Sequence, residues 1–155
     1  MIKHIKGDLL KLAESGEFDI IAHGCNCFHM MGAGIAGQIA KKYPSAPEVD
    51  KLCTKYGDPC KLGTLSTCTG NDDNGLWIVN MYTQFEGGRC PVEILYPSIR
   101  SCFKELRIRC LNLDPNAKIG IPMIGSGIAG GDWNKILDII TEEMHNIDLT
   151  IVEWG

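Results

Sequence analysis

The sequence predicts an α/β fold in which residues 1–155 form a single domain, a three-layer α/β/α sandwich around a central mixed sheet. Two observations support this prediction. Short apolar strands alternate with helices along the chain, which is typical of parallel strands covered on both faces. Near the middle, two strand-like segments are joined by a short polar turn, which predicts one antiparallel pair. The sheet should therefore be mixed.

The first half of the chain contains two predicted strands and a helix. In order, we expect a strand at residues 2–6, a helical turn through Leu9, Leu10 and Leu12, a strand at residues 19–24, a helix at residues 34–42, and an irregular or partly helical segment at residues 45–62. The second strand is short, apolar and closed by Gly24, as expected of a buried strand. The helix should stop near Pro44.

The second half begins with the predicted hairpin, whose polar turn is residues 70–75. In order, we expect strands at residues 64–69 and 76–82, a helix at residues 92–111, a strand at residues 118–123, a helix at residues 132–144 and a strand at residues 148–154. The long helix is amphipathic, and its apolar side should contain Ile94, Ile99, Phe103 and Leu106.

The overall charge limits the partners that the protein can attract. With 45% hydrophobic and 22% charged residues, the composition is that of a globular protein. A net charge of −4 provides no positive field for nucleic acid or an anionic membrane, so an anionic ligand must be held by local geometry. Lys3, Lys6, Asp8 and Lys11 exclude a signal-peptide core, and no apolar run is long enough to span a bilayer. We expect a cytoplasmic monomer whose primary partner is a small molecule.

The eight cysteines do not form a recognisable metal or disulfide pattern. They are scattered without a C-x-x-C pair, and Cys25-x-Cys27 stands alone. We therefore predict reduced, mostly buried thiols that pack as small hydrophobic groups, with no metal site and no cofactor.

A glycine-rich loop that occurs twice is the most informative motif. Residues 32–37 (GAGIAG) and 125–130 (GSGIAG) are identical at five of six positions, and each lies between a predicted buried strand and a helix. Glycines allow the main chain to approach a ligand closely, and successive N–H groups with a helix N-terminus attract anions. Neither hexapeptide contains Lys or Arg, so neutral dipoles would have to hold the anion. The paired loops predict phosphate binding, and the alternative is two tight strand-to-helix turns.

Both loops match G-x-G-x-x-G formally, but their context differs from that of dinucleotide-binding folds. Residues 25–31 separate the first glycine from its strand, and no strand ending in an acidic residue follows at the required distance. No Gly-Lys-Ser/Thr occurs, which excludes a Walker loop.

In these motifs the sequence resembles the macro domain family, whose members bind ADP-ribose and related metabolites. The resemblance rests on residues 6–9 (KGDL), on residues 22–26 (AHGCN) followed by residues 31–36 (MGAGIA), and on residues 121–133 (IPMIGSGIAGGDW). It covers nearly the whole chain. It is nearest to the small stand-alone branch that includes ADP-ribose 1″-phosphate phosphatases.

The resemblance implies a ligand site built from several segments. Asp8 would bind the adenine amino group with the Leu9 amide nearby, Asn26 would contact the distal ribose, and residues 80–85 would wall the distal pocket. The implied ligand-binding residues are Asp8, Leu9, Asn26, Gly32, Ala33, Gly34, Ile35, Tyr82, Gln84, Phe85, Gly125, Ser126, Gly127, Ile128 and Ala129.

The sequence departs from hydrolases of the family in three respects. Gln84 and Phe85 stand where the deglycosylating relatives have a lysine, Ala129 stands where they have an aspartate, and Ala36 stands where another hydrolase group has an acidic residue. The resemblance therefore implies hydrolysis of ADP-ribose 1″-phosphate to ADP-ribose and phosphate. The alternatives are a non-catalytic ADP-ribose reader and an ADP-ribosyl glycohydrolase.

Three residues are candidates for the chemistry, and each has a structural alternative. Asp132 could activate water, but an aspartate before Trp133 is also a good helix N-cap. His29 could act as a general acid or base, or it could be an ordinary loop histidine. Asn26 could contact the ligand or stabilise a turn. Asp8 could likewise be only a helix cap, and His23 at the end of a buried strand is expected to be structural.

Overall fold

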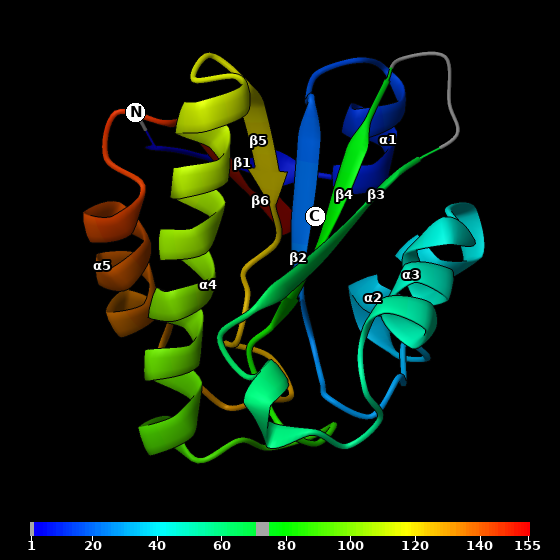
Figure 1. Ribbon diagram of the computed structural model, residues 1–155. Coiled ribbons are helices and arrows are strands. Elements are labelled where there is room, and N and C mark those ends of the chain that lie inside the picture. The colour runs from blue at the N-terminus through cyan, green and yellow to red at the C-terminus, as the bar shows by residue number, and fades with distance from the viewer. Residues whose placement is uncertain (1, 71–74) are drawn as a thin grey trace.

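The structure is a computed structural model that describes residues 2–70 and 75–155 (Figure 1). The strands are β1 (Ile2–Gly7), β2 (Ile20–Cys25), β3 (Leu65–Thr69), β4 (Trp77–Tyr82), β5 (Lys118–Ile121) and β6 (Asp148–Trp154). The helices are α1 (Leu9–Glu14), α2 (Gly34–Lys42), α3 (Ser45–Cys53), α4 (Val92–Leu113) and α5 (Trp133–Glu143), with a short 3₁₀ helix at Pro59–Lys61.

The strands form one mixed sheet in the order β1-β6-β5-β2-β4-β3. Four of the strand pairs are parallel, and β3 pairs antiparallel with β4, as the hairpin motif predicts. Residues 71–74 of the predicted turn lie outside the described residues. The main-chain N–H of Gly70 donates to the carbonyl oxygen of Leu76 at 2.8 Å, so the two strands close on each other at this end.

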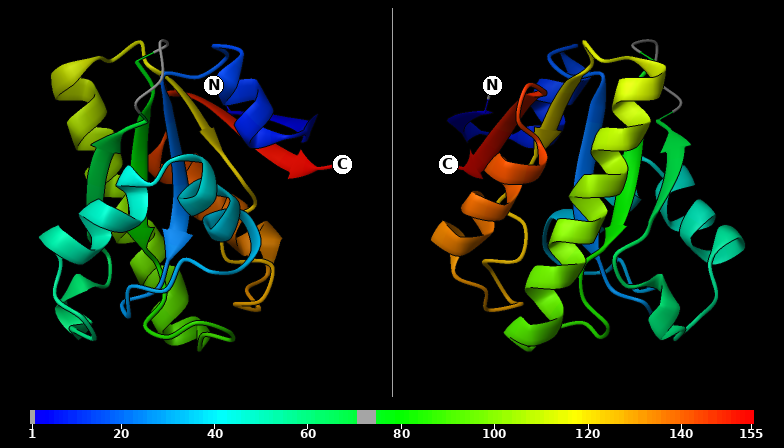
Figure 2. Two further views of the ribbon diagram at one scale, coloured as in Figure 1. Left: turned by 90° about the vertical axis from the view of Figure 1, so that its right-hand side faces the viewer. Right: turned by 60° about the vertical axis from the view of Figure 1, so that its left-hand side comes forward.

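Helices cover both faces of the sheet, which confirms the three-layer prediction. Figure 2 shows α4 and α5 on one face and α1, α2 and α3 on the other. Each face has its own hydrophobic core, and the strands contribute to both by alternation. In β4, Val79 and Met81 belong to the core beneath α4 and α5, whereas Ile78 belongs to the core beneath α1 and α2.

Three details differ from the sequence prediction. The segment expected to be irregular or partly helical contains the regular helix α3, in which Pro47 lies in the first turn, where a missing N–H costs no hydrogen bond. Ile94, predicted on the apolar side of α4, is 38% exposed, and its neighbour Leu95 is fully buried instead. Strand β5 ends at Ile121 because Pro122 follows it.

No helix within residues 2–70 and 75–155 combines the length and the apolarity that crossing a bilayer requires.

Close packing against β5 makes Gly120 a test of the fold. A Cβ atom at this position would lie 2.6 Å from Cδ2 and Cε2 of the Phe18 ring. We expect Gly120→Ala to lower the free energy of unfolding by about 1–3 kcal/mol, the usual cost of overpacking a core. Urea denaturation measures this change. Gly127→Ala is the matched control, since a Cβ there meets no atom within 4 Å. Equal stability of the two variants would contradict the packing argument.

Candidate functional site

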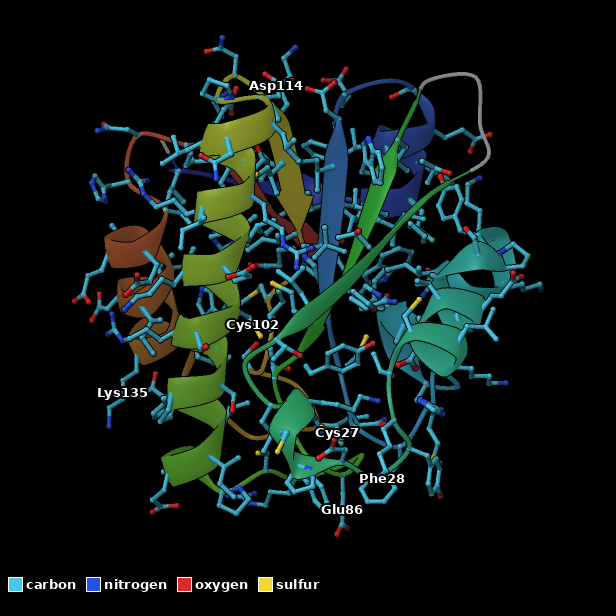
Figure 3. All side chains as sticks on the ribbon, viewed as in Figure 1. Cys27, Phe28, Glu86, Cys102, Asp114 and Lys135 are labelled. Atoms are coloured by element: carbon cyan, nitrogen blue, oxygen red, sulfur yellow. The ribbon has the colours of Figure 1, made fainter. Side chains whose placement is uncertain are left out.

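The loops that follow β2, β4 and β5 gather at one end of the molecule, the lower end in Figure 1. These strands are parallel, so their carboxyl ends share one edge of the sheet, where ligands collect in open α/β folds. Figure 3 places Cys27, Phe28 and Glu86 at this end and Asp114 at the opposite end. Both glycine-rich loops lie at this edge.

A pocket of about 450 Å³ brings the two glycine-rich loops together. The residues that line it are Gly7, Leu9, Gly34, Ile35, Gln38, Pro122, Met123, Ser126, Gly127, Val152, Glu153 and Trp154. Five of the predicted ligand residues are therefore neighbours in space: Leu9, Gly34, Ile35, Ser126 and Gly127.

The first glycine-rich loop presents the N-terminus of α2 to this pocket. No side chain caps this terminus, and the first N–H of the helix with an internal acceptor is that of Gly37, bonded to the Ala33 carbonyl at 3.1 Å. Among the described residues, no hydrogen bond uses the main-chain N–H groups of Gly34 and Ile35. A helix N-terminus with free N–H groups attracts anions.

Main-chain hydrogen bonds within the second glycine-rich loop fix its conformation. The Gly131 N–H donates to the Gly125 carbonyl at 2.8 Å, and the Gly130 N–H donates to the Gly127 carbonyl at 3.1 Å. Gly125 has a φ of 78°, a left-handed conformation that favours glycine. Within the described part of the chain, the N–H groups of residues 126–129 have no hydrogen-bond acceptor. They are free to bind a ligand.

The pocket is lined by neutral dipoles rather than by cations. Among its lining residues the only ionisable side chain is Glu153, the penultimate residue of strand β6. An anion in this pocket would therefore be held by neutral donors, the main-chain N–H groups of the loops among them, as the sequence predicts.

Asp8 and Leu9 directly follow β1, and of the two only Leu9 lines the pocket. The Asp8 carboxylate caps α1 by accepting hydrogen bonds from the N–H groups of Leu10 and Lys11 at 3.1 and 3.2 Å, both at Oδ1. Its Oδ2 makes no hydrogen bond with any described residue, so capping leaves one oxygen for a ligand.

Asn26 and His29 do not line the pocket. The Asn26 side chain bridges its own loop, accepting from the Phe28 N–H and donating to the Met30 carbonyl, both at 2.9 Å. The His29 ring faces the end of α3, where Nε2 lies 3.1 Å from both the carbonyl oxygen and Oγ1 of Thr54. A carbonyl oxygen only accepts hydrogen bonds, so Nε2 is the donor in this contact. Nδ1 is the ring nitrogen that remains available for proton transfer.

The predicted distal wall is only partly available to a ligand. Tyr82 is fully buried, and its hydroxyl contacts Ser66 Oγ at 2.8 Å and donates to Asp50 Oδ1 at 2.7 Å, so its side chain does not reach the pocket. Gln84 Nε2 donates to the carbonyls of residues 86 and 88 at 2.7 and 2.9 Å. Phe85 packs edge-to-face on Phe28 at 4.9 Å. These side chains shape the loop beside the pocket.

Asp132 has the geometry of the structural alternative. Its carboxylate accepts the Asn134 N–H at 2.9 Å and caps α5, while its own N–H donates to the Tyr96 hydroxyl at 3.0 Å. It does not line the pocket.

All eight cysteines are free, and none forms a disulfide. Five are buried as predicted, but Cys53 and Cys60 are exposed because α3 and the 3₁₀ helix turn them to solvent. Burial raises the pKa of the Cys25 thiol, and it raises the pKa of Cys102 to about 12. In the described ranges no group of three or more His, Cys, Asp or Glu side chains could hold a metal ion.

A buried polar network contacts the segment between β2 and α2 from the interior of the protein. Asp50 and Lys61 are 1% and 6% exposed, and the Lys61 ammonium lies 3.6 Å from Asp50 Oδ1 and 3.3 Å from the Cys27 carbonyl. His23, also buried, contacts Asn80 Oδ1 through Nε2 at 2.7 Å. The prediction that His23 is structural agrees with this placement.

Several lining residues were missed in the sequence. Gln38 is one helical turn after Gly34, and this spacing could have identified it. Val152, Glu153 and Trp154 come from the end of β6, whose position next to β1 follows only from the sheet order.

The comparisons with known proteins agree with this architecture. The family model described as "Macro domain" matches residues 22–140. A protein of Enterobacteria phage T4, described as an uncharacterized 17.5 kDa protein, is 38% identical over 155 residues, which cover 99% of this chain and 97% of the phage protein. The ADP-ribose 1″-phosphate phosphatase of Candida albicans is 32% identical, covering 92% of this chain and 93% of the yeast protein.

A solved structure from Bacteroides thetaiotaomicron has the same fold, with a TM-score of 0.80 and 29% identity over 99% of both chains. The matched family model covers both glycine-rich loops, all of β5 and most of β2. This chain belongs to the macro domain family.

Proposed function

We propose that this protein binds ADP-ribose across the pocket and hydrolyses ADP-ribose 1″-phosphate to ADP-ribose and phosphate. One observation carries the proposal: free main-chain N–H groups from two glycine-rich loops converge on one pocket that contains no cation. Such donors match a diphosphate, because each charge-assisted hydrogen bond contributes about 1.5–3 kcal/mol. The name of the Candida albicans relative supports the substrate.

In this proposal the pocket orients the ligand by its two ends. Asp8 Oδ2 and the Leu9 N–H receive the adenine, residues 126–129 bind the diphosphate, and the first loop receives the distal ribose. Hydrolysis adds the oxygen of a water molecule to the terminal phosphorus, the bond from phosphorus to the ribose oxygen breaks, and a proton moves to that oxygen. The free N–H groups stabilise the charge on the phosphoryl oxygens.

Phosphate release from ADP-ribose 1″-phosphate tests this reaction directly. Asp132→Asn and His29→Asn are the informative variants, because asparagine still caps a helix and still tolerates the positive φ of 56° at His29. We expect turnover by the wild type. Loss of turnover in one variant with ADP-ribose binding intact would identify the proton-transfer group. Binding of ADP-ribose without turnover by the wild type would favour the reader, and release of ADP-ribose from a modified macromolecule would favour the glycohydrolase.

Gly127→Val tests the pocket before the chemistry. A Cβ at this position meets no atom within 4 Å, and Gly127 lines the pocket, so the valine side chain would occupy ligand space without disturbing the core. We expect the Kd for ADP-ribose, measured by calorimetry, to rise more than about tenfold, since a blocked N–H donor alone removes about 1.5 kcal/mol or more. The melting temperature should stay within about 2 °C of the wild type. Unchanged affinity would place the ligand elsewhere.

A further inference from the structure

The loop between β4 and α4, residues 83–91, contacts the loops on both sides of it. The Cys27 N–H donates to the Phe85 carbonyl at 2.8 Å, which ties this loop to the segment after β2 that leads into the first glycine-rich loop. The Cys90 N–H donates to the Ala129 carbonyl at 3.0 Å, which ties it to the second. A Cβ on Gly87 would lie 3.7 Å from Asn26 Nδ2. The loop therefore lies beside the end of the site where the distal ribose is expected.

Arg89 lies on this loop against the second glycine-rich loop. A Cβ on Gly130 would be 3.4 Å from Arg89 Cζ and 3.5 Å from both Cγ and Nη1, so the arginine side chain lies along the last residue of the motif. Gly130 has a φ of 84°, and the absence of a side chain there leaves room for the guanidinium. A second pocket, about 370 Å³, is lined by Arg89, Cys90, Pro91, Val92 and Gly130.

The guanidinium of Arg89 has no internal partner. Within residues 2–70 and 75–155 it makes no ion pair and no hydrogen bond. The other three arginines are all engaged: Arg100 with Glu142 and Glu143 at 2.7 and 2.6 Å, Arg109 with Glu105 at 3.1 Å, and Arg107 with the His145 carbonyl. Arg89 is thus a free cation placed next to an anion-binding loop.

The charge of the proposed substrate calls for such a cation. In the proposed function ADP-ribose is bound through its own diphosphate. The terminal phosphomonoester of ADP-ribose 1″-phosphate adds a charge of about −1.5 to −2 to the ligand. The first pocket offers neutral donors and one carboxylate, Glu153, which gives the added charge no counterpart. A guanidinium binds a phosphate through two parallel hydrogen bonds, a geometry that an ammonium group cannot reproduce.

We propose that Arg89 is a specificity-determining residue that binds the terminal phosphate of ADP-ribose 1″-phosphate in the second pocket and so distinguishes it from ADP-ribose. This inference rests on the proposed function. It predicts that the diphosphate and the terminal phosphate are recognised separately, the first by main-chain donors and the second by a side chain.

The experiment compares two ligands across three variants, Arg89→Gln, Arg89→Lys and the control Arg109→Gln, which removes a paired arginine at the opposite end of α4. Calorimetry gives the Kd for ADP-ribose. Steady-state phosphate release gives the KM for ADP-ribose 1″-phosphate, and where the protein shows no turnover calorimetry gives its Kd instead. We expect Arg89→Gln to weaken binding of the 1″-phosphate by about tenfold or more and of ADP-ribose by less than about twofold. Arg89→Lys should lie between, and Arg109→Gln should match the wild type.

Two results would overturn the inference while leaving the proposed function intact. One is that Arg89→Gln weakens binding of both ligands equally. Arg89 would then contact the diphosphate or maintain the conformation of the loop. The other is unchanged affinity for the 1″-phosphate. Failure of the wild type to bind either ligand would instead overturn the proposed function and the inference together. Melting temperatures of the variants exclude unfolding as the cause.

Discussion

Replacing Lys61 with methionine should lower the free energy of unfolding by about 3–5 kcal/mol, the usual cost of removing one partner of a buried ion pair. Lys61 is 6% exposed and its partner Asp50 1% exposed, with Nζ 3.6 Å from Oδ1. The substitution keeps the apolar stem but leaves the Asp50 carboxyl without its cation. Urea denaturation at pH 7 measures the loss.

Burial is the cause of this large effect, and a surface pair provides the control. Lys3 and Asp148 are also 3.6 Å apart, but their side chains are 55% and 40% exposed. Lys3→Met should cost less than about 1 kcal/mol because water screens the pair. The double variant Lys61→Met/Asp50→Leu should recover at least half of the loss, since it removes both buried charges. A double variant less stable than Lys61→Met would contradict the argument.

The substitution Lys61→Met should also weaken binding of ADP-ribose. Lys61 Nζ donates to the Cys27 carbonyl at 3.3 Å and lies 4.6 Å from the centroid of the Tyr82 ring. These contacts hold the segment between β2 and α2, which leads into the first glycine-rich loop. Calorimetry with ADP-ribose on the folded variant separates this effect from the loss of stability.

Acid should destabilise the protein through His23. Burial lowers the pKa of His23 from 6.5 to about 4, although its hydrogen bond to Asn80 acts in the opposite direction. Below pH 6.5 the unfolded chain binds a proton at this residue that the folded chain does not, so stability falls as the pH drops from 6.5 towards 4. The free energy of unfolding falls by roughly 3 kcal/mol in total, since each unit of difference in pKa between the folded and unfolded chains contributes about 1.4 kcal/mol.

His23→Gln isolates this effect, because glutamine keeps an N–H donor for Asn80 but does not titrate. We expect the wild type to lose roughly 3 kcal/mol more than His23→Gln between pH 7 and pH 4, by urea denaturation at each pH. His145→Gln, at an exposed histidine, should follow the wild type throughout. Parallel stability curves for the wild type and His23→Gln would contradict the argument, because they would show that folding does not lower the pKa of His23.

The sequence predicted the features that depend on local patterns. The antiparallel strands β3 and β4 followed from two apolar segments around a polar turn, and the sheet confirms them. The shared pocket of Gly34 and Gly127 followed from repeated strand–loop–helix context, since carboxyl ends of parallel strands meet at one edge. These predictions needed no knowledge of which strands are neighbours.

Other features depend on contacts that no local pattern specifies. The orientation of His29 towards Thr54 depends on where α3 ends, and the sequence predicted only an irregular or partly helical segment there, without bounds for the helix. Asp132 has an equally good sequence context for capping and for catalysis, and only its bond to the Asn134 N–H shows the cap. Arg89 is far from both motifs in the sequence, and its place beside Gly130 follows from the path of the loop after β4.

The donors of the two glycine-rich loops belong to the peptide backbone, so no substitution other than proline can delete them. An alanine scan across residues 126–129 would leave each of these N–H groups in place and would report a site of little importance. Only proline removes such a donor, and only bulk can block it. Binding of this kind therefore tolerates drift in sequence at these positions as long as the path of the chain is kept.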